Sequence, residues 1–316
     1  PPGVEAAGDG RIITPLWWPI FYLQRVSEQN PEQVVEIILG LEQTDNPRIL
    51  REIVSIACDL KDTVLSLRLK PLIKQFLKSP YRWGEEELIV KILKKWGSDQ
   101  GPPRNAAHEI IQYAIAFQPD PKEDEKQSRR KDNPEAWNTS LEPNPRFDQW
   151  EYQQILEKGV RPLAEHEPYQ VSRILIDAVA SMIRLGMHPE DFEKGNDQDY
   201  SEIWCRRLDK PDRDYQDVKG TLVQTLTYAC EQVYDKAPES IDALDQALRN
   251  HRWKVFKRLR QHLYASHPND QTLPWIREQI LGHEDYPKWK HHYEFQLMIH
   301  KASEHFGPRF LSEDER

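Results

Sequence analysis

The segment NPEQVVEIILGLEQTDNPRILREIVSIA, residues 30–57, consists of two similar halves. Each half begins with Asn-Pro and continues with Ile, Leu and Val at intervals of three and four residues. This spacing predicts two short amphipathic helices, with Pro31 and Pro47 in their first turns. Because an isolated helix of about three turns is only marginally stable in water, each helix needs a neighbour to cover its apolar face. Two such helices in succession predict one repeat of a stacked helical scaffold.

Similar amphipathic patterns continue along most of the chain, with almost no strand signal. The first helix would begin with Thr14 as its cap and Pro15 at its first position. Pro71 should bend or break a later helix, because proline removes a backbone hydrogen bond. Helices are predicted at residues 14–26, 30–41, 46–60, 62–78, 85–96, 103–117, 148–163, 168–185, 215–234, 240–248, 251–265, 273–281 and 290–306. These patterns predict an all-α fold, a HEAT-like α-solenoid of stacked antiparallel helix pairs in two sub-stacks.

The charged and Pro-rich segment QPDPKEDEKQSRRKDNPEAWNTSLEPNPR, residues 118–146, interrupts this pattern. Its composition predicts a long loop or linker that is mobile in its first half. The mixed charges of residues 122–131 could bind a partner, but a solvated linker is the favoured interpretation. The predicted domains are a linker at 1–13, N-terminal helical repeats at 14–117, the loop or linker at 118–146 and C-terminal helical repeats at 147–316.

The composition restricts the classes of function. A net charge of −9 argues against bulk electrostatic binding of nucleic acid, although a local basic stripe remains possible. The three cysteines have no CxxC spacing, which is typical of small buried side chains in a reducing cytoplasm. The chain contains no apolar run long enough for a membrane span and no signal-like start. We therefore expect a cytoplasmic protein without a membrane partner. Because the sequence begins PPGVEAAGDGR without Met, we interpret it as a piece of a longer or processed protein.

The aromatic segment PLWWPIFYL, residues 15–23, is the first candidate for a binding surface. Trp17, Trp18, Phe21 and Tyr22 cannot all face one core stripe, so some of them should be exposed or covered by another domain. An exposed apolar patch of that size usually marks an interface. Trp17, Trp18 and Phe21 are therefore predicted to bind a partner.

The helix HRWKVFKRLRQHLYASH, residues 251–267, is the most basic stretch. One interpretation is a helix whose cations follow phosphates while its aromatic residues stack on bases. The other is that an apolar stripe including Phe256 and Leu259 packs in the core and the cations face solvent, and the apolar spacing favours it. The cations could also receive an acidic partner surface. The predicted partner-binding residues on this helix are Arg252, Lys254, Lys257 and Arg258.

Candidate catalytic and metal-binding patterns are weak. The C-terminal histidines His283, His291, His292, His300 and His305 form no HExxH motif. His300 and Glu304 are four residues apart and could share a metal only with a distant third ligand, so a His-rich helix surface is favoured. Ser201 follows Asp197 and Asp199 in a pattern that indicates helix capping, and GxSxG is absent. Without a Walker A loop or GxGxxG, we expect no cofactor, no metal and no catalytic residue.

The order of several motifs resembles the HEAT-like helical-repeat region of large prokaryotic multidomain proteins, which include NTPase-bearing and other conflict-system proteins of anti-phage defence. The matching pieces are Trp18-Pro19 with Tyr22-Leu23, NPEQVVEIIL, NPRILREIVSIA, FDQWEYQQIL, DYSEIW, VKGTLVQTLTYACEQV, WKVFKRLRQHL, and HYEFQLMI followed by FGPRFLSEDER. The CRRLDKPDRD that follows DYSEIW departs from the Trp-Arg continuation of that family, and residues 118–146 have no counterpart. The resemblance implies a sensor or scaffold role outside any enzymatic domain.

Together these patterns predict a non-catalytic protein-interaction or sensor and scaffold module of a larger cytoplasmic protein of bacterial origin, in antiviral defence or signalling. Its partner would be a protein or another domain of the same protein. The alternative is a nucleic-acid-binding helical repeat that uses the basic helix at 251–265. A helical enzyme of unfamiliar type is a further alternative, and it would depend on groups such as His300 or Glu304.

Overall fold

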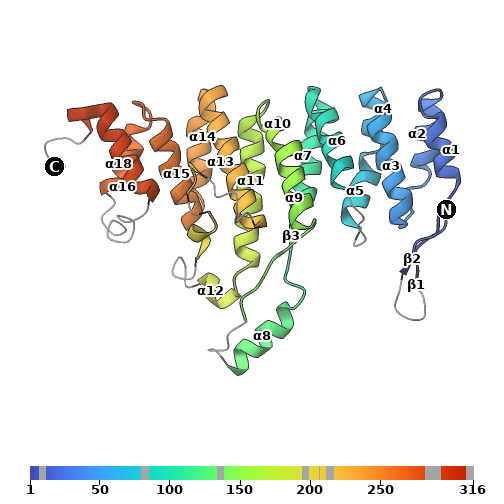
Figure 1. Cartoon of the computed structure of the whole chain (residues 1–316), viewed down its shortest axis with the longest axis horizontal. Helices are drawn as coiled ribbons and strands as arrows, with labels where there is room; N and C mark the ends of the chain where they lie inside the picture. The colour runs from blue at the N-terminus through green and yellow to red at the C-terminus, as the bar shows by residue number, and fades with distance from the viewer. Residues whose placement is uncertain are drawn as a thin grey trace. The chain divides into compact units, whose positions relative to one another are not determined.

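A computed structural model gives the arrangement of the chain (Figure 1). It describes residues 1–6, 12–79, 85–133, 139–193, 199–205, 207–210, 217–281 and 293–310. Helix accounts for 71% of the structure and strand for 2%. The predicted all-α class is therefore confirmed.

Residue contacts divide the chain into two compact units. Unit 1 comprises Pro1–Ala116 and Pro145–Leu163, and unit 2 comprises Phe117–Asn144 and Ala164–Arg316. The predicted division differs from this one at two segments. The helix that follows residue 147 packs with the N-terminal helices, and most of the predicted linker at 118–146 packs with the C-terminal ones.

Unit 1 consists of a pair of two-residue strands followed in the chain by short helices. Its elements are β1 (Glu5–Ala6), β2 (Ile12–Ile13), α1 (Pro19–Val26), α2 (Pro31–Leu39), α3 (Pro47–Asp59), α4 (Thr63–Arg68), α5 (Lys70–Lys78), α6 (Glu86–Ser98), α7 (Pro102–Ala114), α9 (Gln149–Ile155) and the π-helical turn η1 (Leu156–Val160). The strands β1 and β2 are antiparallel, with Glu5 opposite Ile13. Helix α1 contacts α2 and α3, α3 contacts α5 and α6, and α6 contacts α7 and α9. Each helix thus covers the apolar face of a neighbour.

Proline and asparagine determine where these helices begin. Pro47 lies in the first turn of α3, as the sequence predicts. Asn46 caps α3, because its side-chain oxygen accepts a hydrogen bond from the backbone N–H of Arg48 at 3.0 Å. The prediction that the first helix begins at Pro15 is wrong, since α1 begins at Pro19. The carbonyl of Pro15 instead accepts a hydrogen bond from the Asn46 side chain at 2.8 Å.

Pro71 separates two helices, as predicted. Helix α4 ends at Arg68, and α5 begins at Lys70 with Pro71 in its first turn. A proline is tolerated there because the N–H groups of the first turn have no partner within the helix.

A buried chain of hydrogen bonds joins α3, α4 and α6 in the core of unit 1. Trp96 is fully buried, and its indole N–H donates to the hydroxyl of Ser66 at 3.1 Å. The same hydroxyl donates to the carbonyl of Ala57 at 2.7 Å. The ammonium of Lys95 also donates to the carbonyls of Ala57 and Cys58 at 2.9 and 3.3 Å, at the end of α3. These bonds satisfy helix-end carbonyls that would otherwise lack partners.

Two glycines explain why the helix after residue 147 belongs to unit 1. A Cβ atom at Gly97 would lie 2.7 Å from Cδ1 of Leu163, and one at Gly159 would lie 2.8 Å from Cδ1 of Leu93. The absence of these side chains lets α6 and η1 approach each other closely.

Unit 2 consists mainly of longer helices, together with the segment Phe117–Asn144 that contains helix α8. Its elements are β3 (Phe117–Gln118), α8 (Glu123–Asp132), β4 (Asn144–Pro145, at the unit boundary), α10 (Arg161–Ala164, also at the boundary), α11 (Pro168–Leu185), α12 (Pro189–Glu193), the 3-10 helix η3 (Ser201–Ile203), α13 (Val218–Lys236), the 3-10 helix η4 (Pro238–Ser240), α14 (Ile241–Arg249), α15 (Lys254–Ser266), α16 (Leu273–Leu281), α18 (Tyr293–Phe306) and the 3-10 helix η5 (Gly307–Arg309). Helix α11 packs on α13 and α14, and α15 packs on α14 and α18. Helix α11 ends at Leu185, and the predicted stop, Gly186, is the residue that follows it.

The predicted loop at 118–146 is wrong for most of its first half, which forms helix α8 (Glu123–Asp132). Acidic residues fill the first turn of α8 and basic residues fill its last turn, so both ends complement the helix dipole. None of its side chains is buried. The helix is held to unit 2 by Arg130, whose guanidinium donates to both carboxylate oxygens of Asp191 at 2.6 and 2.8 Å. Trp137 lies outside the described residues.

Asp120 forms hydrogen bonds with residues on both sides of α8 and within it. Its carboxylate accepts hydrogen bonds from the ammonium of Lys126 at 2.7 Å and from the backbone N–H groups of Lys122 and Glu142 at 2.8 and 2.9 Å. Burial alone would raise the pKa of Asp120, but these hydrogen bonds outweigh it and lower the pKa from 3.8 to about 2.

We expect Ser66→Ala to lower the free energy of unfolding by about 1–3 kcal/mol, because the indole N–H of Trp96 would stay buried without its acceptor. Urea unfolding followed by circular dichroism measures the change. Ser98→Ala is the matched control: Ser98 is exposed, and its loss should cost less than about 0.5 kcal/mol. Equal effects of the two substitutions would contradict the buried network.

We expect Asp120→Asn to loosen residues 120–142 at neutral pH, measured as faster hydrogen exchange in α8. The folded-state pKa lies below the unfolded one. The stabilisation is therefore complete above pH 3.8 and is lost as the pH falls towards about 2. The carboxyl ¹³C shift of Asp120 should titrate with a midpoint near that lower value. Asp124→Asn, an exposed position in α8, should leave the exchange nearly unchanged. Identical exchange in the two variants would refute the anchoring role of Asp120.

Candidate interaction surfaces

Helix α1 brings the predicted aromatic residues together. Trp18 precedes Pro19, and the helix places Trp18 and Tyr22 one turn apart. Trp18 is 73% exposed and Tyr22 is 66% exposed, whereas Trp17 and Phe21 are half-buried. The rings of Trp18 and Phe21 lie 5.9 Å apart between centroids. We call these four residues, Trp17, Trp18, Phe21 and Tyr22, the aromatic surface.

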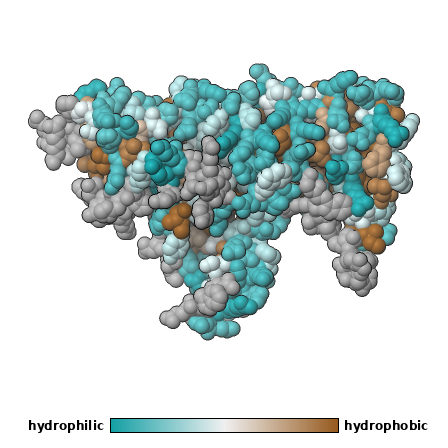
Figure 2. All heavy atoms as spheres, in the orientation of Figure 1, coloured by the Kyte–Doolittle hydropathy of each residue, from teal (hydrophilic) through white to brown (hydrophobic). Residues whose placement is uncertain are grey.

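Two hollows adjoin the aromatic surface. One has a volume of about 190 Å³ and lies between α1 and α3, where Trp17 and Phe21 face Ile49. The other is more open, about 560 Å³, and is lined by Trp18, Phe21 and Tyr22. Phe21 therefore separates two depressions that could each receive an apolar side chain. Figure 2 shows a mostly hydrophilic face, on which hydrophobic residues lie in several separate groups, one of them near α1 and α2 and another near α16 and α18.

The rim of these hollows carries arginines. Arg48 and Arg51 line the smaller hollow, and Arg25 lines the larger one. Arg51 forms an ion pair with Glu52 at 2.7 Å. Glu52 also lines the smaller hollow, so the edges of the two depressions together carry three arginines and one carboxylate around apolar centres.

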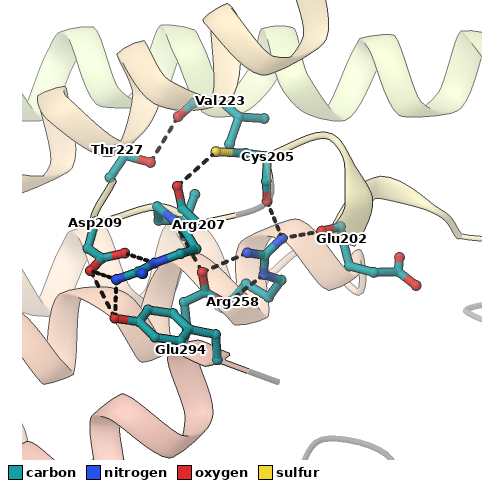
Figure 3. A network of polar contacts seen from close by, with 10 residues as sticks. Glu202, Cys205, Arg207, Asp209, Val223, Thr227, Arg258 and Glu294 are labelled. Carbon is teal, nitrogen blue, oxygen red and sulfur yellow. Dashed lines mark hydrogen bonds and ion pairs between the residues drawn. The ribbon is translucent and has the colours of Figure 1, made fainter. Parts of the chain in front are cut away.

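The basic helix, α15, differs from the prediction at Arg258. This side chain is 4% exposed and does not face solvent. Its guanidinium donates to both carboxylate oxygens of Glu294 at 2.9 and 2.6 Å. It also donates to the carbonyls of Glu202 and Cys205 (Figure 3). The charge of Arg258 is thus used inside unit 2, and this geometry does not favour Arg258 as a partner-binding residue.

Two other cations of the predicted basic segment, Lys254 and Arg252, also contact residues of unit 2. The ammonium of Lys254 donates to the carbonyl of Asp199 at 2.7 Å and to the carboxylate of Glu202 at 3.0 Å. Arg252 is exposed, but its guanidinium lies 4.6 Å from the ring centroid of Phe192 and 4.5 Å from that of Trp253. It also donates to the carbonyl of Phe192.

Lys257 is half-buried, and Arg260, a further cation of α15, is buried. Arg260 donates to the carboxylate of Asp245 at 2.9 Å. The helix therefore presents far less positive charge than its sequence suggests.

Side chains from a distant segment cap the start of α15. The backbone N–H of Lys254 donates to the carboxylate of Asp199 at 2.5 Å, and that of Val255 donates to the hydroxyl of Ser201 at 3.1 Å. Asp199 also accepts from the backbone N–H of Ser201 at 2.8 Å. The sequence predicted capping by these residues, and the structure assigns them to α15 as well as to the local turn. Asp197, the other predicted capping residue, lies outside the described residues.

A second polar cluster lies beside Arg258 and was not found from the sequence. Arg207 forms two hydrogen bonds to Asp209 at 2.9 and 2.6 Å, and the hydroxyl of Tyr293 donates to Asp209 at 3.0 Å. Figure 3 shows this cluster next to the Arg258–Glu294 pair. The hydrogen bond from Arg207 lowers the pKa of Asp209. Because Tyr293 lies more than eighty positions from Arg207 and Asp209, no local pattern could have indicated that it joins them.

His300 and Glu304, the pair considered as metal ligands, lie on the surface of α18. His300 and Glu304 are exposed and lie 3.1 Å apart, beside Lys301. Within the described ranges, no group of three or more His, Cys, Asp or Glu side chains could hold a metal ion. His283, His291 and His292 lie outside those ranges. Burial raises the pKa of Cys58 and Cys230 to about 12, which keeps both thiols protonated.

Comparisons with protein-family models, with curated proteins and with solved structures find no match to this chain. No helix in the described part of the chain is both long and apolar enough to cross a membrane. The functional interpretation therefore depends on the surfaces and clusters described above.

We expect Arg258→Ala to lower the free energy of unfolding by about 3–5 kcal/mol, because it leaves the buried carboxylate of Glu294 without its partner. Lys257→Ala, one position earlier and half-buried, should cost less than about 1 kcal/mol. Replacing both partners, Arg258→Met with Glu294→Leu, should recover much of the loss, because no uncompensated charge then stays buried. Chemical unfolding monitored by circular dichroism gives the three values. Equal stability of Arg258→Ala and Lys257→Ala would exclude a structural role for the ion pair.

Proposed function

We propose that this chain is a non-catalytic protein-interaction module, a sensor or scaffold part of a larger protein, and that it binds its partner through the aromatic surface. The observation that carries this proposal is the exposure of Trp18 and Tyr22 above two apolar hollows. We further propose that each unit forms a HEAT-like α-solenoid of helix pairs. A cytoplasmic setting in anti-phage defence or signalling is part of the same proposal and comes from the sequence resemblance.

The chemistry of the aromatic surface supports a protein partner. Tryptophan, tyrosine and arginine are the residues that most often dominate binding energy at protein interfaces. Trp17 and Trp18 directly precede α1 and Tyr22 lies in its first half, and arginines of α1 and α3 lie at the edge. Fixed apolar hollows between packed helices lose little conformational entropy when they receive a side chain.

The charges around the hollows indicate the kind of partner. Arg25, Arg48 and Arg51 surround an apolar centre. An amphipathic helical segment fits this arrangement, with aliphatic or aromatic side chains in the hollows and carboxylates against the arginines. We propose such an acidic amphipathic segment, from a partner protein or from another domain of the same protein, as the ligand.

The alternative, nucleic-acid binding through α15, has less support. Arg258 and Arg260 are buried in ion pairs, and Lys254 is bonded to Glu202. A phosphate-binding helix needs its cations at the surface. If a nucleic acid does bind, the affinity should fall steeply with salt, and charge reversal at Lys254 and Lys257 should abolish it.

We expect peptides selected against the protein from a library of displayed helices to combine apolar residues on one face with flanking carboxylates. A selected peptide should bind Trp18→Ala at least about tenfold more weakly than the wild type, because a central aromatic anchor is lost. Trp150→Ala is the matched control, since Trp150 is also in unit 1 and is 59% exposed. Isothermal titration calorimetry gives both affinities, and circular dichroism checks the fold of each variant. The proposal fails if selection yields no binder, or if Trp150→Ala weakens binding as much as Trp18→Ala does.

A further inference from the structure

Unit 2 contains a cavity that is separate from the aromatic surface. Its volume is about 390 Å³, within the range of small-molecule sites. Its wall is formed by five segments that are distant in the sequence: α8, residues 139–143, the end of α11 with α12, residues 199–204, and the start of α13. A cavity assembled from so many segments is held open by the packing of unit 2.

The cavity has an apolar wall and an aromatic one. Met182, Ile183 and Leu141 supply aliphatic surface, and Trp204 supplies a flat ring. Methionine side chains adapt to ligands of different shape. The wall would therefore accept a flat apolar or aromatic group.

The two carboxylates that line the cavity already accept hydrogen bonds. Asp191 receives both hydrogen bonds of Arg130. Asp199 accepts from the backbone N–H groups of Ser201 and Lys254 with its two carboxylate oxygens. These two carboxylates thus have little remaining capacity to attract a cation.

Lys219 supplies a positive charge to the cavity lining. It lies at the start of α13 and lines the cavity, with its ammonium 5.5 Å from the ring centroid of Trp204. Among the described residues, no carboxylate forms an ion pair with it. The nearby Asp217 side chain is bonded to the backbone N–H of Gly220 at 2.7 Å. The four charged side chains in the lining, Arg130, Lys219, Asp191 and Asp199, sum to zero, but Lys219 is the cation among them that has no carboxylate bonded to it in the described part of the chain.

We propose that this cavity binds a small organic anion, with its carboxylate or phosphate group at Lys219 and its flat apolar body between Trp204 and the aliphatic wall at Met182 and Ile183. Binding here would place a small-molecule site in unit 2, independent of the protein-binding surface on α1 of unit 1. A site of this kind would give the module a chemical signal to sense in addition to a partner.

The test uses 1-naphthoate, 1-naphthyl phosphate and the neutral 1-naphthamide in isothermal titration calorimetry with the full chain. We expect one or both anions to bind with a Kd below about 1 mM, and the amide to bind at least about tenfold more weakly. The comparison of naphthoate with naphthyl phosphate identifies the preferred head group. No binding of either anion, or equal binding of the amide, would overturn the proposal.

Variants locate the binding in the cavity. Lys219→Met should weaken anion binding about tenfold or more, whereas Lys236→Met, on the same helix and away from the cavity, should leave it unchanged. Ser140→Trp places a large ring at the exposed rim and should block binding without disturbing the core. Trp18→Ala should have no effect, which separates this site from the aromatic surface. Binding that survives both Lys219→Met and Ser140→Trp would show that the anion binds elsewhere and would refute the proposal.

Discussion

The burial of apolar stripes between neighbouring helices is the constraint on which this structure depends. Most helices of unit 1 have three turns or fewer, which is too short for stability alone. Most of these helices bury Ile, Leu or Val side chains against other helices of the same unit. The same constraint explains the aromatic surface, because α1 is the first helix of unit 1 and its outer face has no further helix of the described chain to cover it.

Buried polar groups add specificity to this apolar packing. Arg258 and Glu294 lie in the interior of unit 2, and further hydrogen bonds from Arg258 satisfy two backbone carbonyls. In unit 1 the Trp96–Ser66–Ala57 chain has the same effect with neutral groups. A helix that slipped along its neighbour by one turn would keep much of its apolar contact, but it would leave these polar groups buried without partners. The polar groups therefore fix which register the helices adopt.

The two proposed sites differ in the physical source of their affinity. At the aromatic surface, exposed rings would gain by removal from water, and peripheral arginines would orient the partner. In the cavity of unit 2, the apolar wall is already shaped, and the ammonium of Lys219, which has no carboxylate partner among the described residues, would select for an anion. Helix α8 contributes Arg130 to the lining of this cavity. The segment at 117–144, whose composition suggested a linker, therefore forms part of the proposed site.

The sequence by itself determined the helical class, most helix positions and the starts of α2 and α3, because apolar spacing, proline and asparagine act on the backbone within a few residues. It also identified the aromatic residues near Trp18, since one helix cannot bury so many large side chains in a row. Only the tertiary structure decided the state of the charges. On α15, Arg258 and Lys254 looked like solvent-facing cations, but Glu294 and Glu202 lie elsewhere in the sequence and meet them only after folding. Helix α8 was missed for a related reason: it has no apolar stripe, and its stability comes from end charges and from the distant Asp191. Apolar periodicity is a local signal, whereas the pairing of charges depends on which segments the fold brings together.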